Sequence, residues 1–213
     1  LGGYVVLNNK KNSLIMDVGS SPNTKLSSNY QAGALSFEII SNGKKLISNC
    51  GYFQKVDHQL NEISKSSAVH NTLVLDDKSS CNFNKVRGKK SKINQGLRIL
   101  KKKIVFEKNY WKINASHDGY LKLHGIVHDR EIEFYPEQLK FIGHDKIISN
   151  KGIKNLKFEI RFHLEPNVKV MKTQDRKSIL IDLDGSRRPQ RRQDVCLVPS
   201  AHTPGISRVR SLS

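Results

Sequence analysis

The sequence is short of acidic residues and cysteines, and it has no long apolar run. Only 19 Asp and Glu accompany 37 Lys and Arg, so the formal net charge of the 213-residue chain is +18. The three cysteines lie too far apart for a zinc ribbon or CxxC motif, and their odd number disfavours a disulfide framework. No apolar run reaches the roughly 20 residues that cross a bilayer. We therefore expect no membrane span and buried free thiols at Cys50, Cys81 and Cys196, with a Cys50–Cys81 disulfide as the alternative.

The excess of positive charge favours a polyanionic partner, since clustered cations attract phosphate, sulfate or carboxylate polymers. Nucleic acid and acidic glycan both fit that description. A solvated lysine face is an equally good interpretation, because residues 1–185 contain 26 Lys but only 5 Arg. The sequence has no helix-turn-helix pattern, no RNP-like aromatic strand and no zinc-finger spacing, so a nucleic-acid partner is not predicted.

Apolar and polar residues alternate along most of the chain, which predicts β-strands. The clearest strand covers residues 34–39 and runs into Asn42-Gly43, a dipeptide suited to a type I′ hairpin turn, with residues 44–48 as the returning strand. Further strands are predicted over residues 73–75, 99–106, 113–115, 120–127, 156–164 and 178–183. No stretch of ten or more residues has helical periodicity. Short strands separated by frequent turns predict an all-β fold, an antiparallel β-sandwich.

The composition changes at Ser186, which divides the chain into a β domain over residues 1–185 and a tail over residues 186–213. The tail contains six Arg, no Lys and three of the six prolines. We expect it to be disordered and dispensable. A basic binding tail is one interpretation, and a non-native segment produced by a shifted reading frame is the other. The chain begins at Leu1 without an initiator methionine, which favours a mature or truncated product.

Three segments carry a resemblance to a known family: residues 30–38 (YQAGALSFE), 67–73 (SAVHNTL) and 116–120 (SHDGY). Their order and spacing resemble the heparinase II/III-like family over residues 1–185. Members of that family join an α/α toroid to a C-terminal β-sandwich and cleave uronate-containing acidic polysaccharides by β-elimination. The resemblance implies that this chain is the sandwich, that its partners are an acidic polysaccharide and an N-terminal toroid of the same protein, and that it works in the periplasm or cell envelope.

The resemblance also shows a departure at the catalytic segment. The family's sandwich supplies a histidine from a His-x-His-Ala-Asp-like segment, where this sequence has Asn29, Gln31 and Gly33. The fragment is therefore expected to be inactive alone, and a non-catalytic glycan-binding or structural sandwich is the alternative. Some members hold a structural zinc at positions that read Gln31, Asn49 and His70 here. One conventional ligand is too few for zinc, so no metal and no other cofactor is predicted.

His70 is the candidate catalytic residue, because it precedes a predicted strand in a family-like segment; the alternative is a histidine that fixes a strand end. His117 is a candidate for substrate binding, although bracing the Asp118-Gly119 turn is the simpler role. Arg130 could bind a carboxylate or sulfate, or form an ion pair with Glu131 or Glu133. The remaining candidates for substrate binding are Tyr30 and Gln31.

The other histidines and aromatic residues have plainer interpretations. His124 and His128 alternate with apolar residues and are predicted to lie on a solvated strand face. Tyr30, Tyr120 and Trp111 could stack on sugar rings, but aromatic residues in strands more often fill a core.

Overall fold

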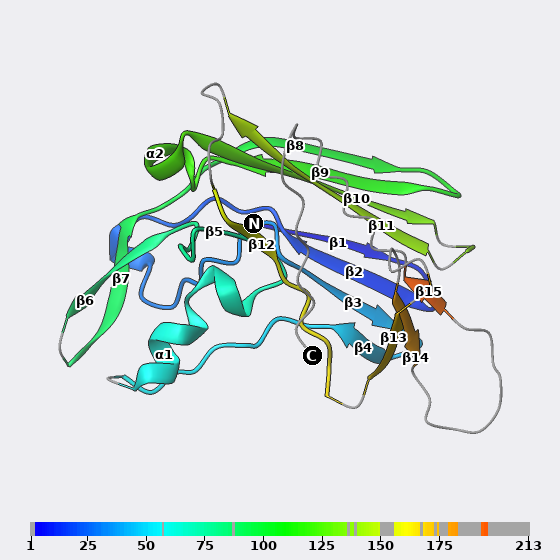
Figure 1. The fold of residues 1–213 in the computed structure, drawn as a ribbon, viewed down its shortest axis with the longest axis horizontal. Helices are drawn as coiled ribbons and strands as arrows, with labels where there is room; N and C mark the ends of the chain where they lie inside the picture. The colour runs from blue at the N-terminus through cyan, green and yellow to red at the C-terminus, as the bar shows by residue number, and fades with distance from the viewer. Residues whose placement is uncertain are drawn as a thin grey trace.

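The structure is a computed structural model that describes residues 3–56, 58–86, 88–135, 137–138, 140–149, 156–166, 168–172, 174, 179–182 and 193–195. Two four-stranded antiparallel sheets lie one above the other as the layers of a sandwich (Figure 1). The first sheet has the order β1-β2-β3-β4 and consists of β1 (Tyr4–Asn8), β2 (Asn12–Asp17), β3 (Phe37–Ser41) and β4 (Lys44–Ile47). The second has the order β11-β10-β9-β8 and consists of β8 (Ile99–Phe106), β9 (Trp111–His117), β10 (Ile126–Tyr135) and β11 (Lys140–Ser149). The predicted all-β sandwich is confirmed.

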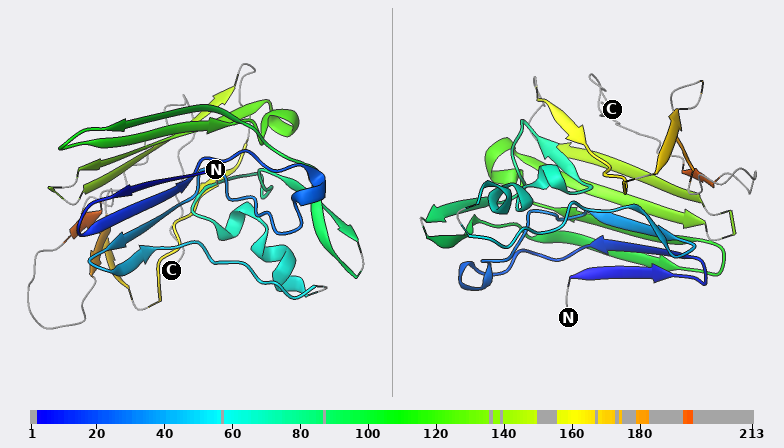
Figure 2. Two further views of the ribbon diagram at one scale, coloured as in Figure 1. Left: turned by 180° about the vertical axis from the view of Figure 1, so that it is seen from behind. Right: turned by 90° about the horizontal axis from the view of Figure 1, so that it is seen from below.

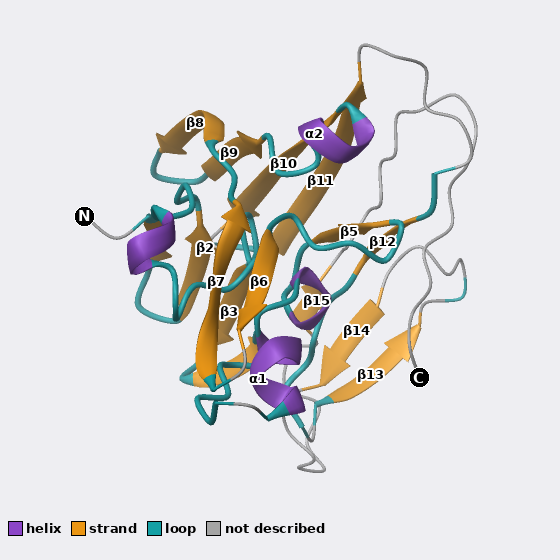
Figure 3. Ribbon diagram, turned by 90° about the vertical axis from the view of Figure 1, so that its left-hand side faces the viewer, coloured by secondary structure: helices purple, strands orange, loops and turns teal. Residues whose placement is uncertain are grey.

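Smaller elements surround the sandwich (Figures 2 and 3). A hairpin of β6 (Asn82–Val86) and β7 (Lys89–Gln95) extends from one end, near the short helix α1 (Gln59–Ser64). Strand β5 (Leu73–Leu75) pairs with β12 (Phe158–Ile160), and β13 (Lys169–Lys172), β14 (Ile179–Asp182) and β15 (Gln193–Val195) form a third small sheet. The remaining helical turns are η1 (Thr24–Leu26), η2 (Ser67–Val69) and α2 (Leu121–His124).

The core between the two layers follows from strand alternation, because every second side chain points inward. In the second sheet the inward row at one end is an aromatic ladder in which Phe106, Trp111, Phe134 and Phe141 lie opposite one another on four neighbouring strands. Their ring centroids are 5.0, 4.8 and 4.2 Å apart in that order. Trp111, Phe134 and Phe141 are buried, whereas Phe106, on the edge strand, is 65% exposed. The cross-strand contacts of these rings favour this register of the sheet.

The predicted hairpin at Asn42-Gly43 is confirmed. Ser41 pairs with Lys44, and Asn42 and Gly43 have φ angles of 49° and 76°, as a type I′ turn requires. The strand before it is shorter than predicted, because β3 begins at Phe37. Leu35 interrupts the strand with a left-handed φ of 59°.

The predicted strand over residues 120–127 is wrong. Residues Leu121–His124 form one turn of helix, and Gly125, at φ 66°, ends it. Leu121 and Leu123, whose spacing suggested a strand, are 47% and 49% exposed. The buried residues of this segment are Tyr120 and Ile126, which flank the turn and pack with β5.

The C-terminal part differs from the prediction in two details. Within residues 156–164 only Phe158–Ile160 form a strand, although Leu164 makes a single bridge to Ile47. Gln193–Val195 pair with β14, inside a segment for which the sequence predicts no strand. The other residues of the segment 186–213 lie outside the described residues, as does Cys196, and the dispensability of this tail stays a prediction.

The cysteines that the structure describes, Cys50 and Cys81, are free, so the alternative of a disulfide between them is not realised. The expected burial is confirmed for Cys81 and is wrong for Cys50, which is exposed. Within the described part of the chain, no helix is long and apolar enough to cross a membrane.

Candidate functional site

The candidate site residues that we predicted from the sequence lie in two places. Tyr30, Gln31 and His70 belong to the loops beside β3 and β5, whereas His117 and Arg130 lie on the inner face of the second sheet. The first place includes an exposed surface, and the second is enclosed.

Gln31 ties two loops together. Its Nε2 donates hydrogen bonds to the carbonyl oxygens of Gly51, at 3.0 Å, and Ser64, at 2.6 Å. Both amide hydrogens are thus engaged with the backbone, and the side chain is half-buried. A carboxamide neither gains nor loses a net proton near neutral pH, so Gln31 stabilises this surface but cannot act as an acid or base.

Next to Gln31 lies a group of polar side chains that we call the Asn29 cluster: Asn29, Tyr52 and Lys90. The exposed Asn29 Oδ1 accepts hydrogen bonds from Lys90 Nζ at 2.8 Å and from the Tyr52 hydroxyl at 3.4 Å. The Lys90 ammonium also lies 5.8 Å from the centroid of the Tyr52 ring. An aromatic ring, a cation and an amide suit a charged sugar. Sequence reasoning missed Tyr52 and Lys90, because no local motif links residues so far apart in the chain.

His70 is a buried brace, only 4% exposed. Its Nδ1 lies 2.8 Å from the Ser66 carbonyl oxygen, to which it donates a hydrogen bond, and Gly33 packs directly on the ring. Burial lowers the pKa of His70, although the Ser66 carbonyl opposes this effect. The ring is therefore neutral at pH 7 and fixes the segment before β5, the structural role considered above.

The three positions that resemble a zinc site do not form one. Gln31 is engaged as described, and Asn49 Oδ1 accepts a hydrogen bond from the Asn71 backbone N–H at 2.8 Å. Within the described residues, no group of three or more His, Cys, Asp or Glu side chains could hold a metal ion.

Two further basic side chains approach this region from the segment that follows β12. His163 Nε2 lies 3.1 Å from the Ala68 carbonyl oxygen, and Arg161 Nη1 donates to the same oxygen at 3.4 Å. Both are half-buried. The sequence predicts only a strand over residues 156–164, so the position of these two side chains against the η2 turn was missed.

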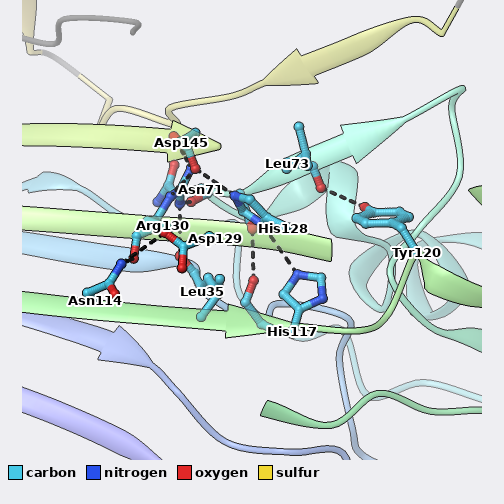
Figure 4. Close-up of polar contacts among 12 residues, drawn as sticks. Leu35, Asn71, Leu73, Asn114, His117, Tyr120, His128, Asp129, Arg130 and Asp145 are labelled. Atoms are coloured by element: carbon cyan, nitrogen blue, oxygen red, sulfur yellow. Dashed lines mark hydrogen bonds and ion pairs between the residues drawn. The ribbon is translucent and has the colours of Figure 1, made fainter. Parts of the chain in front are cut away.

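The second place is a network of buried polar groups, shown in Figure 4. The Gly119 backbone N–H donates to His117 Nδ1 at 3.1 Å. His117 must therefore carry its proton on Nε2, which lies 3.3 Å from His128 Nδ1, and His128 must then carry its proton on Nε2, which lies 2.6 Å from Asp145 Oδ1. Every donor in this chain meets an acceptor only if both histidines are neutral and Asp145 is ionised.

The electrostatics of this network agree with its hydrogen bonds. Burial lowers the pKa of His128, opposed by Asp145, and burial together with His128 and Arg130 lowers the pKa of His117 further. Burial alone would raise the pKa of Asp145, but Arg130 and His128 lower it more, so the net shift is downward. His117 braces the Asp118-Gly119 turn as predicted and is 1% exposed.

Arg130 connects this network to the first sheet and to the His70 segment. Its Nε and Nη2 bind Asp145 at 2.7 and 3.1 Å, while Nη1 donates to the carbonyl oxygens of Leu35, at 2.8 Å, and Asn71, at 2.5 Å. The side chain is buried, so its contacts are internal. The alternative of an ion pair with Glu131 or Glu133 is wrong.

Strand β10 also carries other residues for which the sequence made predictions. Glu131 and Glu133 instead bind Lys112, from which their oxygens lie at 3.0 and 2.9 Å. The prediction of a solvated His128 is wrong, because this residue points inward on β10 and is fully buried. The same prediction is wrong for His124, which lies on α2 rather than on a strand and has a side chain that is only 17% exposed.

The aromatic candidates fill the core. Trp111 and Tyr120 are buried, and the Tyr120 hydroxyl donates to the Leu73 carbonyl at 2.7 Å. Tyr30 is half-buried and packs on a small cluster that includes Cys81. Burial raises the pKa of Tyr30 and raises that of Cys81 to about 12. These side chains stabilise the loop that carries Gln31.

Comparison with solved structures identifies the same architecture in polysaccharide lyases. The heparan sulfate lyase HepC from Pedobacter heparinus superimposes with a TM-score of 0.62 at 14% identity over 84% of this chain. A structure of heparinase III gives 0.59 at 21% identity, and a heparinase III gene product gives 0.62 at 17%, each again over 84% of this chain. At these identities the likeness concerns the fold. This chain spans about a quarter of the length of each of those proteins (26%, 26% and 25%).

No curated protein sequence matches the chain. Residues 1–210, almost its full length, match the family described as heparinase II/III-like, C-terminal. The chain therefore belongs to the heparinase II/III-like C-terminal family.

Proposed function

We propose that this chain forms one wall of the substrate cleft of a lyase that acts on uronate-containing acidic glycans, and that it holds the glycan without transferring its protons. Membership of the heparinase II/III-like family supports the class of substrate. The similar solved structures, which are described as a heparan sulfate lyase and as heparinase III, support it as well.

One observation carries the second half of this proposal. β-Elimination needs a group that neutralises the uronate carboxylate, a base for the C5 proton and an acid for the departing oxygen. At the positions where the resembled enzymes have histidines, this chain has Asn29 and Gln31, and both amides are engaged in hydrogen bonds. They can orient a sugar, but they cannot move a proton at neutral pH.

His70 does not replace them. It is buried, it donates to the Ser66 carbonyl, and burial lowers its pKa. The proton-transferring groups would come from an N-terminal α/α toroid, which the resembled enzymes place across the cleft. The periplasm or cell envelope, where an enzyme meets external polysaccharide, suits this function.

A non-catalytic glycan-binding or structural sandwich is the second candidate, and the engagement of Gln31 with the backbone favours it. Both candidates predict that this chain alone has no lyase activity. They differ in the kind of domain that they require upstream of it. A gene that continues upstream into several hundred residues of amphipathic helix pairs supports the lyase, and an unrelated upstream domain supports the binding module.

Equilibrium dialysis tests the proposal for the chain itself. Purified protein should retain heparan sulfate but not neutral dextran, retention should weaken as salt rises, and the polysaccharide should keep its length on gel filtration. Equal retention of dextran, or no retention of heparan sulfate, would contradict glycan binding. Shortened chains would contradict the absence of proton transfer.

A further inference from the structure

The β6–β7 hairpin carries charge of one sign only. Residues 82–95 contain five basic residues and no acidic residue. Lys85, Lys89 and Lys92 are exposed, and the hairpin projects from the end of the sandwich near α1 (Figures 1 and 3). Like charges so close together repel each other, so they are not there to stabilise the hairpin.

Several lysines elsewhere in the chain are paired with carboxylates. Lys112, Lys157 and Lys45 each lie within 4 Å of a carboxylate oxygen. Within the part of the chain that the structure describes, no carboxylate pairs with Lys85, Lys89 or Lys92. Their charge is therefore available to a partner in solution.

The hairpin is nevertheless firmly held at its base. The buried Lys65 donates from Nζ to both the carbonyl oxygen and the hydroxyl oxygen of Ser91, at 2.8 Å each, and it lies over the Phe83 ring. The Ile93 backbone N–H donates to Ser27 Oγ at 2.9 Å. With Ser91 and Ile93 buried against the body, Lys92 between them is directed outward. The charges are thus presented on an ordered strand.

Lys90 links the hairpin to the candidate cleft. It lies on β7 between Lys89 and Ser91, and its ammonium binds Asn29 Oδ1 and lies against the Tyr52 ring. The contacts of Lys90 therefore place the Asn29 cluster beside β7, the strand that also carries Lys89 and Lys92. A polyanion bound at the cluster would continue along these lysines.

We propose that the β6–β7 hairpin is a polyanion-binding arm, which holds the carboxylate and sulfate groups of an acidic polysaccharide beside the Asn29 cluster. This inference rests on the function proposed above and names the element that would carry substrate affinity. Lysine suits the task, because its ammonium is a point charge that accepts anions in many geometries. The arm thus favours charge density over a particular sulfation pattern.

The test compares two variants that lose the same charge. Lys85→Gln/Lys89→Gln/Lys92→Gln removes the arm's exposed cations. The control, which we call the β8 variant, is Lys102→Gln/Lys103→Gln/Lys108→Gln, which removes three exposed lysines from the edge strand β8 and the turn after it. Titration calorimetry with a heparan sulfate oligosaccharide at several salt concentrations measures affinity and salt dependence. Unchanged melting temperatures confirm that each variant folds, and a variant that melts early is replaced by its single substitutions.

The arm variant should bind on the order of tenfold more weakly than the β8 variant. Its salt slope should fall by about one for each lost contact. Equal losses in the two variants, or none in the arm variant, would overturn the arm while leaving the proposed function intact. Failure of the unmodified chain to bind heparan sulfate would overturn both. A DNA oligonucleotide of matched charge that binds more tightly would overturn the assignment to a glycan.

Discussion

The buried ion pair between Arg130 and Asp145 should be the most sensitive point of the fold. Substituting Arg130→Met would leave the Asp145 carboxylate, only 12% exposed, without its cation. The carbonyl oxygens of Leu35 and Asn71 would also lose their donor, and Leu35 holds a left-handed φ of 59° beside it. Breaking a buried pair on one side costs about 3–5 kcal/mol. That is a large part of the roughly 5–15 kcal/mol that stabilise a typical domain.

Urea unfolding followed by tryptophan fluorescence measures this loss. Trp111 is the only tryptophan of the chain and is 4% exposed, so its emission reports on the core. The double variant Arg130→Met/Asp145→Leu should recover part of the loss, because no buried charge is left unpaired. Recovery should be incomplete, since His128 Nε2 would then lack its acceptor.

A surface pair provides the control for this experiment. Lys157 and Asp77 lie 3.1 Å apart, but their side chains are 55% and 67% exposed. Lys157→Met should therefore change the free energy of unfolding little or not at all. If Arg130→Met costs no more than Lys157→Met, the network in Figure 4 does not hold the two sheets together, and the reasoning is refuted.

Two further predictions follow from the same contacts. Because burial lowers the pKa of His117 and His128 in the folded chain, only the unfolded chain takes up their protons near its pKa of about 6.5. Stability should then fall as pH drops from 7.5 to 6, by up to about 0.8 kcal/mol for each histidine. Urea titrations at several pH values check this, and a flat profile would contradict it. Gly33→Ala should cost about 1–3 kcal/mol, because its Cβ would lie 2.7 Å from His70 Cδ2. Gly143→Ala, whose Cβ meets nothing within 4 Å, is the control in thermal melts, and equal melting temperatures would show that the His70 ring can move aside.

The sequence predicted the fold class and many strands because most inward positions are apolar. It missed β1 and β2, and it missed β11, where inward positions serve the polar network. On β11 the inward residues include Gly143 and Asp145 beside Phe141, so the segment shows no clean alternation and was not predicted as a strand. Without β11, Asp145 could not be recognised as the partner of Arg130, its direct neighbour in the register.

The candidate surface was predictable only in part. The resemblance located Asn29 and Gln31, because they occupy a segment that the family shares. Tyr52 and Lys90 join them only through tertiary contacts between segments more than 20 residues apart. The β6–β7 hairpin was not predicted as strands. Its position beside the Asn29 cluster depends on the buried contacts between Lys65 and Ser91, which no sequence pattern reveals.

The central claim is that this wall of the cleft holds acidic glycan without transferring protons. The most direct measurement is the absorbance of unsaturated uronate while the purified chain is incubated with heparan sulfate, in parallel with the His70→Ala variant. General acid and base groups typically contribute about 10²- to 10⁴-fold each, so their absence at Asn29 and Gln31 predicts a flat trace for both proteins. A steady rise that His70→Ala abolishes would contradict the account, and it would make His70 the acid or base of a self-sufficient active site.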